Sequence, residues 1–326
     1  MSLISQNFRY SFAAVAFALV ATTACARETQ VTPVDPAPLG TFSPVHNPAV
    51  PSVVTLCGKN IDMDVADFYE RYDRELTSVA YTHGTTLLIL KRANRYFPQL
   101  APILRRNGVP EDLLYLACVE SSLNPRAVSP AKAAGIWQFM PSTAKEYGLE
   151  VSDEVDERYN IEKATEAACR YFKRALSRYN GDWMAVMAAY NAGMARISGQ
   201  LERQRSGDAL DLYLADETMR YPFRVMAMKT ILEHPSDYGF TISADQLYQP
   251  REVEVVEVSG PVESWADWAA ARGISYLNLR DENPWIRSDK LTNKTGKTYR
   301  VRVPKKESLR RSTARASVYN SDWITK

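Results

Sequence analysis

The sequence contains few histidines and cysteines, which supply many of the metal ligands in proteins. Its 326 residues include three histidines and four cysteines. The histidines stand singly, and no His-Glu-x-x-His pattern occurs. The cysteine spacing is not that of a metal site either. We therefore expect neither a metal nor a cofactor. The residues concerned are His46, His83 and His234, together with Cys25, Cys57, Cys118 and Cys169.

Two of these cysteines, Cys118 and Cys169, fall in apolar helical patterns. This position predicts buried thiols. A bond between the two is left open, because an oxidising compartment would permit one.

Neither sign of charge is in large excess. The chain has 40 Lys and Arg against 38 Asp and Glu, a net charge of +2, which gives no indication of a nucleic-acid partner. The distribution is uneven, since residues 300–326 hold eight basic residues and two acids. We interpret 306–326 as a solvated basic tail, with weak attraction to an anionic surface as the alternative.

A long apolar run is also missing. The segment "SFAAVAFALVATTACA" follows Arg9 and is too short and too rich in small residues for a membrane span. It has the layout of a secretory signal, so residues 1–26 predict export to the periplasm or cell envelope. Ala24-Cys25-Ala26 fits ordinary cleavage. In the other interpretation Cys25 becomes the first mature residue and carries lipid, which would make the protein an outer-membrane lipoprotein.

The remaining chain is too long for one ordinary domain, and its composition divides it. Residues 27–60 are rich in Pro, Val and Thr and predict an extended linker. Residues 61–240 repeat apolar positions at helical spacing, with a helix expected to end near Phe97 and caps expected at Asn160 and Asp182. The fold class predicted for this part is mainly α.

Residues 250–305 show another pattern. "REVEVVEVSG" alternates charged residues with valine, which is typical of a strand, and "KTYRVRVP" predicts a closing strand. Two short helical segments lie between them. The segment therefore predicts a small βααβ unit.

Glu120 is an acid in an apolar helix. On a helical wheel Leu116, Ala117 and Glu120 fall within about 60° of Leu113. Burial and the negative end of the helix dipole both disfavour a carboxylate here, so its pKa should rise and the acid could donate a proton near neutral pH. The alternative is a glutamate at a frayed helix end, turned towards water.

Four motifs stand in order around this acid. They are Glu120-Ser121, then Gly135-Ile136-Trp137-Gln138-Phe139-Met140-Pro141, then Ala189-Tyr190-Asn191-Ala192-Gly193, then Glu217-Thr218 with Tyr221. In this order they resemble the lytic transglycosylases of glycoside hydrolase family 23, of the membrane-bound type D, over residues 95–235. Lys132 departs from the family pattern, which commonly has Gly there, so either the loop differs or Lys132 adopts a backbone conformation that Lys tolerates less well than Gly.

This resemblance implies a lysozyme-like helical fold and an enzyme that acts on peptidoglycan glycan strands. Glu120 would be the catalytic residue, first as general acid and then as general base. The attacking group would be the C6 hydroxyl of N-acetylmuramic acid (MurNAc), so that cleavage of its β-1,4 bond to N-acetylglucosamine (GlcNAc) leaves a 1,6-anhydromuramyl end. The residues that the resemblance assigns to substrate binding are Ser129, Gln138, Met140, Tyr190, Asn191, Glu217 and Tyr221.

Alternatives to this activity remain. A hydrolase similar to goose-type lysozyme, or a non-catalytic peptidoglycan-binding scaffold, would use the same fold. Trp137 is either a core residue or a sugar-stacking residue. The unit at 250–305 resembles a LysM module, with Trp265 and Trp268 in its first helix. Its first turn has Gly260-Pro261-Val262-Glu263 in place of Gly-Asp-Thr-Leu, so it either binds glycan or only caps the catalytic domain.

Overall fold

The computed structural model describes residues 46–294, 296–313 and 316–324. The predicted signal sequence, Cys25 and the linker up to residue 45 lie outside the described residues. Among the described helices, none combines the length and the apolar character needed to cross a bilayer.

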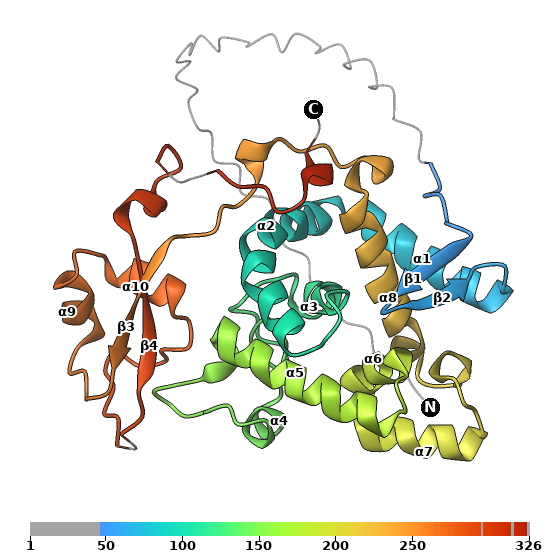
Figure 1. Ribbon diagram of the computed structural model, residues 1–326, viewed down its shortest axis with the longest axis horizontal. Coiled ribbons are helices and arrows are strands. Elements are labelled where there is room, and N and C mark those ends of the chain that lie inside the picture. Colours follow the sequence, from blue (N-terminus) through green and yellow to red (C-terminus); the bar gives the residue numbers. More distant parts are fainter. Residues whose placement is uncertain (1–45, 295, 314–315, 325–326) are drawn as a thin grey trace, which may run out of the picture. The chain divides into compact units, whose positions relative to one another are not determined.

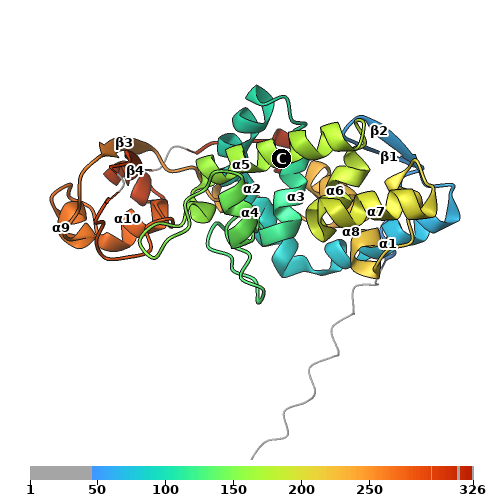
Figure 2. The same cartoon turned by 90° about the horizontal axis from the view of Figure 1, so that it is seen from below.

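Eight α-helices of the described chain form the larger part of the fold (Figure 1). They are α1 (Ala66–Tyr81), α2 (His83–Arg106), α3 (Leu113–Ser121), α4 (Pro141–Glu146), α5 (Ile161–Arg178), α6 (Trp183–Ala192), α7 (Met194–Gln204) and α8 (Asp216–Glu233). The predicted mainly α fold is confirmed. In both views α3 lies in the middle of this helical part (Figures 1 and 2).

Two predicted caps are confirmed. The Asn160 side chain accepts from the Lys163 N–H at 3.1 Å and begins α5. The Asp182 side chain accepts from the Met184 N–H at 2.8 Å and begins α6. Each side-chain oxygen satisfies an amide that has no acceptor within the helix.

The prediction that a helix would end near Phe97 is wrong. α2 runs without a break from His83 to Arg106 although Pro98 and Pro102 lie inside it. Each proline removes a backbone donor. The buried apolar side chains on both sides of Pro98 compensate, since Phe97 and Leu100 belong to the core.

Part of the predicted linker is a hairpin. Strands β1 (Val53–Leu56) and β2 (Lys59–Asp62) pair antiparallel, with Leu56 opposite Lys59. Val54, Leu56 and Ile61 are buried in the helical core. Residues 53–62 therefore belong to the folded body, because their alternate side chains are buried there.

The C-terminal unit has the predicted βααβ order. Strands β3 (Val253–Val258) and β4 (Tyr299–Pro304) pair antiparallel, and α9 (Trp265–Ala270) and α10 (Tyr276–Glu282) lie between them in the chain. This unit has its own buried cluster, which includes Trp265 and Trp285. Trp268 is only partly buried, and the Arg272 guanidinium lies 3.5 Å from the centre of its ring.

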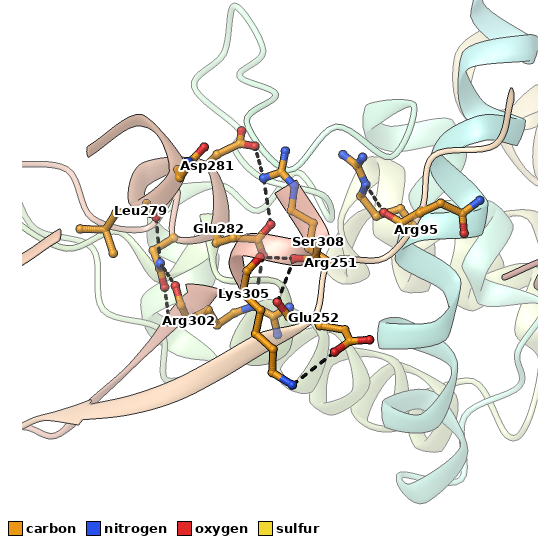
Figure 3. Close-up of polar contacts among 12 residues, drawn as sticks. Arg95, Arg251, Glu252, Leu279, Asp281, Glu282, Arg302, Lys305 and Ser308 are labelled. Atoms are coloured by element: carbon orange, nitrogen blue, oxygen red, sulfur yellow. Dashed lines mark hydrogen bonds and ion pairs between the residues drawn. The ribbon is translucent and has the colours of Figure 1, made fainter. Parts of the chain in front are cut away.

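Polar contacts join this unit to the segments next to it (Figure 3). Arg251 binds Asp281 and, at 3.0 Å, Glu282, both on α10. Asp281 also binds Arg126 of the helical part. The Asp156 N–H donates to the Trp285 carbonyl at 2.9 Å. The unit is therefore attached to the helical part by charged and backbone contacts as well as by the chain.

The C-terminal segment is not wholly a solvated tail. Trp323 is 2% exposed, and its indole N–H donates to the Leu232 carbonyl of α8. Its ring and that of Tyr319 both lie against Phe97 of α2. The expectation fails for this stretch because its aromatic side chains, rather than its basic ones, determine where it packs.

The cysteines of the described chain are free thiols. Cys118 and Cys169 are buried, and burial raises the pKa of Cys169 to about 12. The bond that the sequence left open is thus not formed. Among the described residues no cluster of His, Cys, Asp or Glu is arranged to hold a metal ion.

Candidate active site

Glu120 lies in the last turn of a helix that is buried on most sides. Six of the nine residues of α3 are buried, while Glu120 keeps part of its surface exposed. Ser122, which follows the last residue of the helix, has a left-handed backbone (φ 52°) and donates its N–H to the Cys118 carbonyl at 2.8 Å. The Ser121 hydroxyl donates to the Ile136 carbonyl at 2.8 Å. This end is hydrogen-bonded into the fold, which contradicts the frayed-end alternative.

The surroundings of the Glu120 carboxyl favour its protonated form. Burial raises its pKa to about 7, although the Tyr221 hydroxyl and the charge of Arg224 act in the opposite direction. The negative charge of Glu217 adds to the increase. Tyr221, which is buried in α8, donates its hydroxyl hydrogen bond to Glu120 Oε1. The arrangement can therefore hold a proton near neutral pH and release it to a basic atom.

Tyr190 of α6 is close enough to Glu120 to feel its charge. Burial raises the pKa of Tyr190 well above its usual value, with a further contribution from the Glu120 charge. Its hydroxyl donates to the Trp137 carbonyl at 2.6 Å, and its ring packs between Tyr171 and Phe172. These contacts fix the Tyr190 side chain beside the acid.

Asn191 and Glu217, which the resemblance assigns to substrate binding, have different surroundings. The Asn191 side-chain oxygen accepts from the Thr218 hydroxyl at 2.9 Å, which joins the end of α6 to the start of α8. Glu217 is more exposed, and Arg224 donates to both of its oxygens, at 2.7 and 3.2 Å. The hydrogen bonds from Arg224 lower the pKa of Glu217.

The loop after α3 brings the next predicted residues together. The Ser129 hydroxyl accepts from the Ala133 N–H at 3.0 Å. Lys132 has a φ of 67°, so it takes the left-handed conformation that glycine adopts more easily. The departure at Lys132 therefore leaves the turn in place at some cost in backbone strain.

Gln138 and Met140 follow in this loop. Gln138 also has a positive φ, 50°, and its side-chain Nε2 donates to the carbonyls of Gly135 and Ala127 at 2.8 and 3.2 Å. Met140 is 40% exposed and offers an apolar surface. Trp137 is fully buried, and its indole N–H donates to Thr165 at 2.9 Å. Trp137 is thus a core residue, which decides a point that the sequence left open.

Sequence reasoning missed Arg220 and Arg224, which bind Glu217, and Glu75 of α1, which binds both arginines. Glu217, Arg220 and Arg224 share one helix face at steps of three and four residues, and this spacing was a usable signal for their pairing. Nothing in the local sequence marks Glu75 as their partner.

A cavity of about 440 Å³ lies elsewhere, between α2, α5 and the C-terminal unit. Its lining includes Arg95, Pro102, Tyr159, Arg251 and Trp285, and Figure 3 shows Arg95 and Arg251 near this place. Neither Glu120 nor any of the substrate-binding candidates lines it.

The order of the motifs and the fold around Glu120 agree with a comparison against protein families. Residues 97–212 match the Transglycosylase SLT domain. This segment of the chain is similar to an SLT domain. Residues 254–307 match the Soluble lytic transglycosylase C-terminal LysM-like domain, so the βααβ unit is LysM-like as the sequence indicated. Glu120, Tyr190 and Asn191 lie inside the matched SLT segment, whereas Glu217 and Tyr221 follow it.

Individual relatives have related names. Membrane-bound lytic murein transglycosylase D of Escherichia coli strain K12 is 33% identical over 255 residues, which cover 76% of this chain and 54% of that protein. Peptidoglycan transglycosylase gp16 of Escherichia phage T7 is 39% identical over 105 residues, 31% of this chain and 8% of that protein. The chain thus spans about half the length of the transglycosylase D that it matches.

Among solved structures, the 70 kDa soluble lytic transglycosylase of Escherichia coli aligns with a TM-score of 0.35. The identity is 21%, over 41% of this chain and 24% of that chain.

Proposed function

We propose that this protein is a lytic murein transglycosylase, which cleaves the β-1,4 bond between MurNAc and GlcNAc in peptidoglycan. The observation that supports this proposal best is Glu120, an acid whose pKa is raised to about 7 beside Tyr221 in an SLT domain. The names of the relatives, lytic murein transglycosylase and peptidoglycan transglycosylase, agree with this activity.

Glu120 performs both proton transfers in the proposed reaction. It first donates its proton to the glycosidic oxygen while the bond from that oxygen to MurNAc C1 breaks. The Glu120 carboxylate then takes the proton of the MurNAc C6 hydroxyl as that oxygen bonds to C1. Glu120 is protonated again at the end. The products are a GlcNAc hydroxyl and a 1,6-anhydromuramyl end, and no water is consumed.

The state of Glu217 supports an internal attacking group. Glycosidases that use water or a covalent intermediate need a second carboxylate as base or nucleophile. Glu217 is the carboxylate whose charge acts on Glu120, but Arg224 binds both of its oxygens and lowers its pKa. A carboxylate bound in this way is a weak base and a weak nucleophile.

The substrate-binding assignments are part of the same proposal. Met140 presents an exposed apolar surface for a sugar ring. Both described hydrogen bonds of the Gln138 side chain use Nε2, which leaves Oε1 to accept from a sugar hydroxyl. Ser129, Tyr190, Asn191, Glu217 and Tyr221 complete the proposed set.

We also propose that the protein works in the cell envelope, exported by the signal sequence that precedes Cys25 and anchored through lipid on Cys25 as the first mature residue. The names of the membrane-bound relatives support this location. Replacing Cys25 by Ala should move the protein from the membrane fraction to the soluble periplasmic fraction. An unchanged distribution would exclude this anchor.

Mass spectrometry of digested peptidoglycan tests the activity. The wild-type protein should release fragments with anhydromuramyl ends, lighter by one water than reducing ends. Glu120→Gln should lower the rate by at least about a hundredfold, because the amide cannot donate this proton. Glu111→Gln, which changes an acid just before α3, is the matched control and should keep the wild-type rate.

Other results would identify the alternatives. Reducing ends would show a hydrolase similar to goose-type lysozyme. Binding to peptidoglycan without turnover by the wild-type protein would indicate a scaffold. Unchanged turnover in Glu120→Gln would overturn the assignment of the acid.

A further inference from the structure

Glu75 is a buried acid that the proposed reaction does not use. It lies in α1 and is 2% exposed. Oε1 accepts from Arg220 Nη1 at 2.6 Å, and Oε2 accepts from Arg224 Nε at 2.7 Å. Each oxygen thus binds one arginine of α8, which packs along α1 (Figures 1 and 2). A buried carboxylate is tolerated in a protein when it is paired in this way.

The far side of Arg224 binds a second acid. Its Nη1 and Nη2 donate to the two oxygens of Glu217, at 2.7 and 3.2 Å. Such a pair of parallel hydrogen bonds fixes the direction of the planar guanidinium. Glu75 and Glu217 therefore hold Arg224 between them. Arg220 supports the arrangement, since it contacts Glu75 and, at 3.4 Å, Glu217.

Arg224 is also the cation whose charge acts on Glu120. The other groups that face this acid are Tyr221 and Glu217 from α8 and Tyr190 from α6. α2 contributes Arg92, which donates to the Ser122 carbonyl at 3.0 Å just after α3. The effect of Arg224 on the Glu120 pKa depends on how far Glu75 and Glu217 neutralise the Arg224 charge. It also depends on the direction in which they hold the Arg224 guanidinium.

We propose that Glu75 is a positioning residue that keeps Arg224 bound to Glu217 and turned away from Glu120, so that Glu120 keeps its proton. This inference rests on the proposed function of Glu120 and adds how the protonation of Glu120 is controlled. Glu75 precedes the matched SLT segment, which begins at residue 97, so α1 supplies to the site a charge that the matched segment lacks.

Glu75→Gln tests this role, because the amide has nearly the same shape and lacks the negative charge. Arg224 then has one carboxylate fewer to bind and acts more strongly on Glu120, so the Glu120 pKa falls. We expect the alkaline limb of the pH profile for turnover to move to a pH that is lower by about one unit. At pH values above this limb, turnover should therefore fall on the order of tenfold. Turnover on the acid side should stay within about twofold of wild type.

The matched control is Glu70→Gln, the same substitution at an exposed position of the same helix, which should leave the profile unchanged. Glu75→Asp keeps the negative charge, so the alkaline limb of its pH profile should lie close to the pH of the wild-type limb. In an Arg224→Gln background, Glu75→Gln should shift the limb much less, because the cation that transmits its effect is absent.

A carboxyl-detected NMR titration of Glu120 measures the same pKa without turnover. If the wild-type protein releases no anhydromuramyl ends, the proposed function fails, and the titration still decides whether Glu75 controls Glu120. The inference is overturned if folded Glu75→Gln shows an unchanged Glu120 pKa, or if its turnover falls equally at every pH, as a purely structural role would predict.

Discussion

Glu120 and Glu217 lie on different helices, and their surroundings shift their pKa values in opposite directions. Burial raises the pKa of Glu120, whereas hydrogen bonds from Arg224 lower that of Glu217. An acid that stays protonated and a neighbour that stays ionised form a division of roles that suits proton donation. Under the proposed mechanism, turnover should fall as the pH rises through about 7, because Glu120 then loses the proton that it must donate.

The raised Glu120 pKa also affects stability, and this effect can be measured separately. The Glu120 pKa is about 7 in the folded protein and about 4.5 when the group is unperturbed, so the folded state binds the proton more tightly. The folded state therefore loses stability relative to the unfolded state as the pH rises from about 4.5 to about 7.

Glu120→Gln removes this titration. Its free energy of unfolding, relative to wild type, should rise between about pH 4 and about pH 8 by up to about 3 kcal/mol. Urea unfolding of both proteins at the two pH values checks it. A difference that stays the same at the two pH values would contradict the raised pKa.

The second half of the loop between α3 and α4 contains three residues with positive φ. Lys132, Gly135 and Gln138 have values of 67°, 80° and 50°. Gly135 alone among them also lacks room for a side chain, since a Cβ there would lie 1.8 Å from the Arg158 carbonyl oxygen. The loop that carries Ser129, Gln138 and Met140 therefore packs directly on the backbone before α5.

Gly135→Ala should destabilise the protein by roughly 3 kcal/mol, because the new methyl group meets backbone that cannot rotate away. Gly181→Ala separates the cost of the close contact from the cost of the positive φ. Gly181 also has a positive φ, 90°, but nothing lies within 4 Å of its Cβ position. We expect about 1 kcal/mol there, the cost of the left-handed backbone. Equal losses in chemical denaturation would exclude the close contact as the cause.

At the scale of the molecule, the LysM-like unit is connected to the helical part by the chain on both of its sides. Asn94 of α2 is buried and binds both connections. Its Nδ2 donates to the carbonyls of Tyr248 and Ser317 at 3.2 and 3.0 Å, and its Oδ1 accepts from the Tyr319 N–H at 2.8 Å. One side chain thus holds the segment that leads to the LysM-like unit and the segment that returns from it.

Trp323 lies in the segment that returns from the LysM-like unit and packs in the core of the helical part. Removing its side chain should therefore lower the stability of the folded protein. Trp323→Ala should lower the free energy of unfolding by about 3 kcal/mol, as for a large core side chain. Tyr213→Ala removes an aromatic ring that is 82% exposed and should change it by less than about 0.5 kcal/mol. Equal effects in urea unfolding would mean that Trp323 is not part of the core in solution.

Local patterns in the sequence were enough to predict much of this protein. The caps at Asn160 and Asp182, the alternation of valine in β3 and the apolar surroundings of Glu120 depend on neighbours within a few residues along the chain. The SLT and LysM-like domains were predicted from ordered motifs and are confirmed. The substrate-binding roles stay predictions.

Other features required residues far apart in the chain to meet. The continuity of α2 through Pro98 depends on core contacts, and the position of Trp323 depends on α2 and α8. The partner of Arg224 is 149 positions away at Glu75. The sequence by itself determined the helix starts at Asn160 and Asp182, the strand β3 and which acid is surrounded by apolar residues, because those are local properties. Only the tertiary structure decided which charges neutralise one another around that acid, because pairing between distant helices is set by packing.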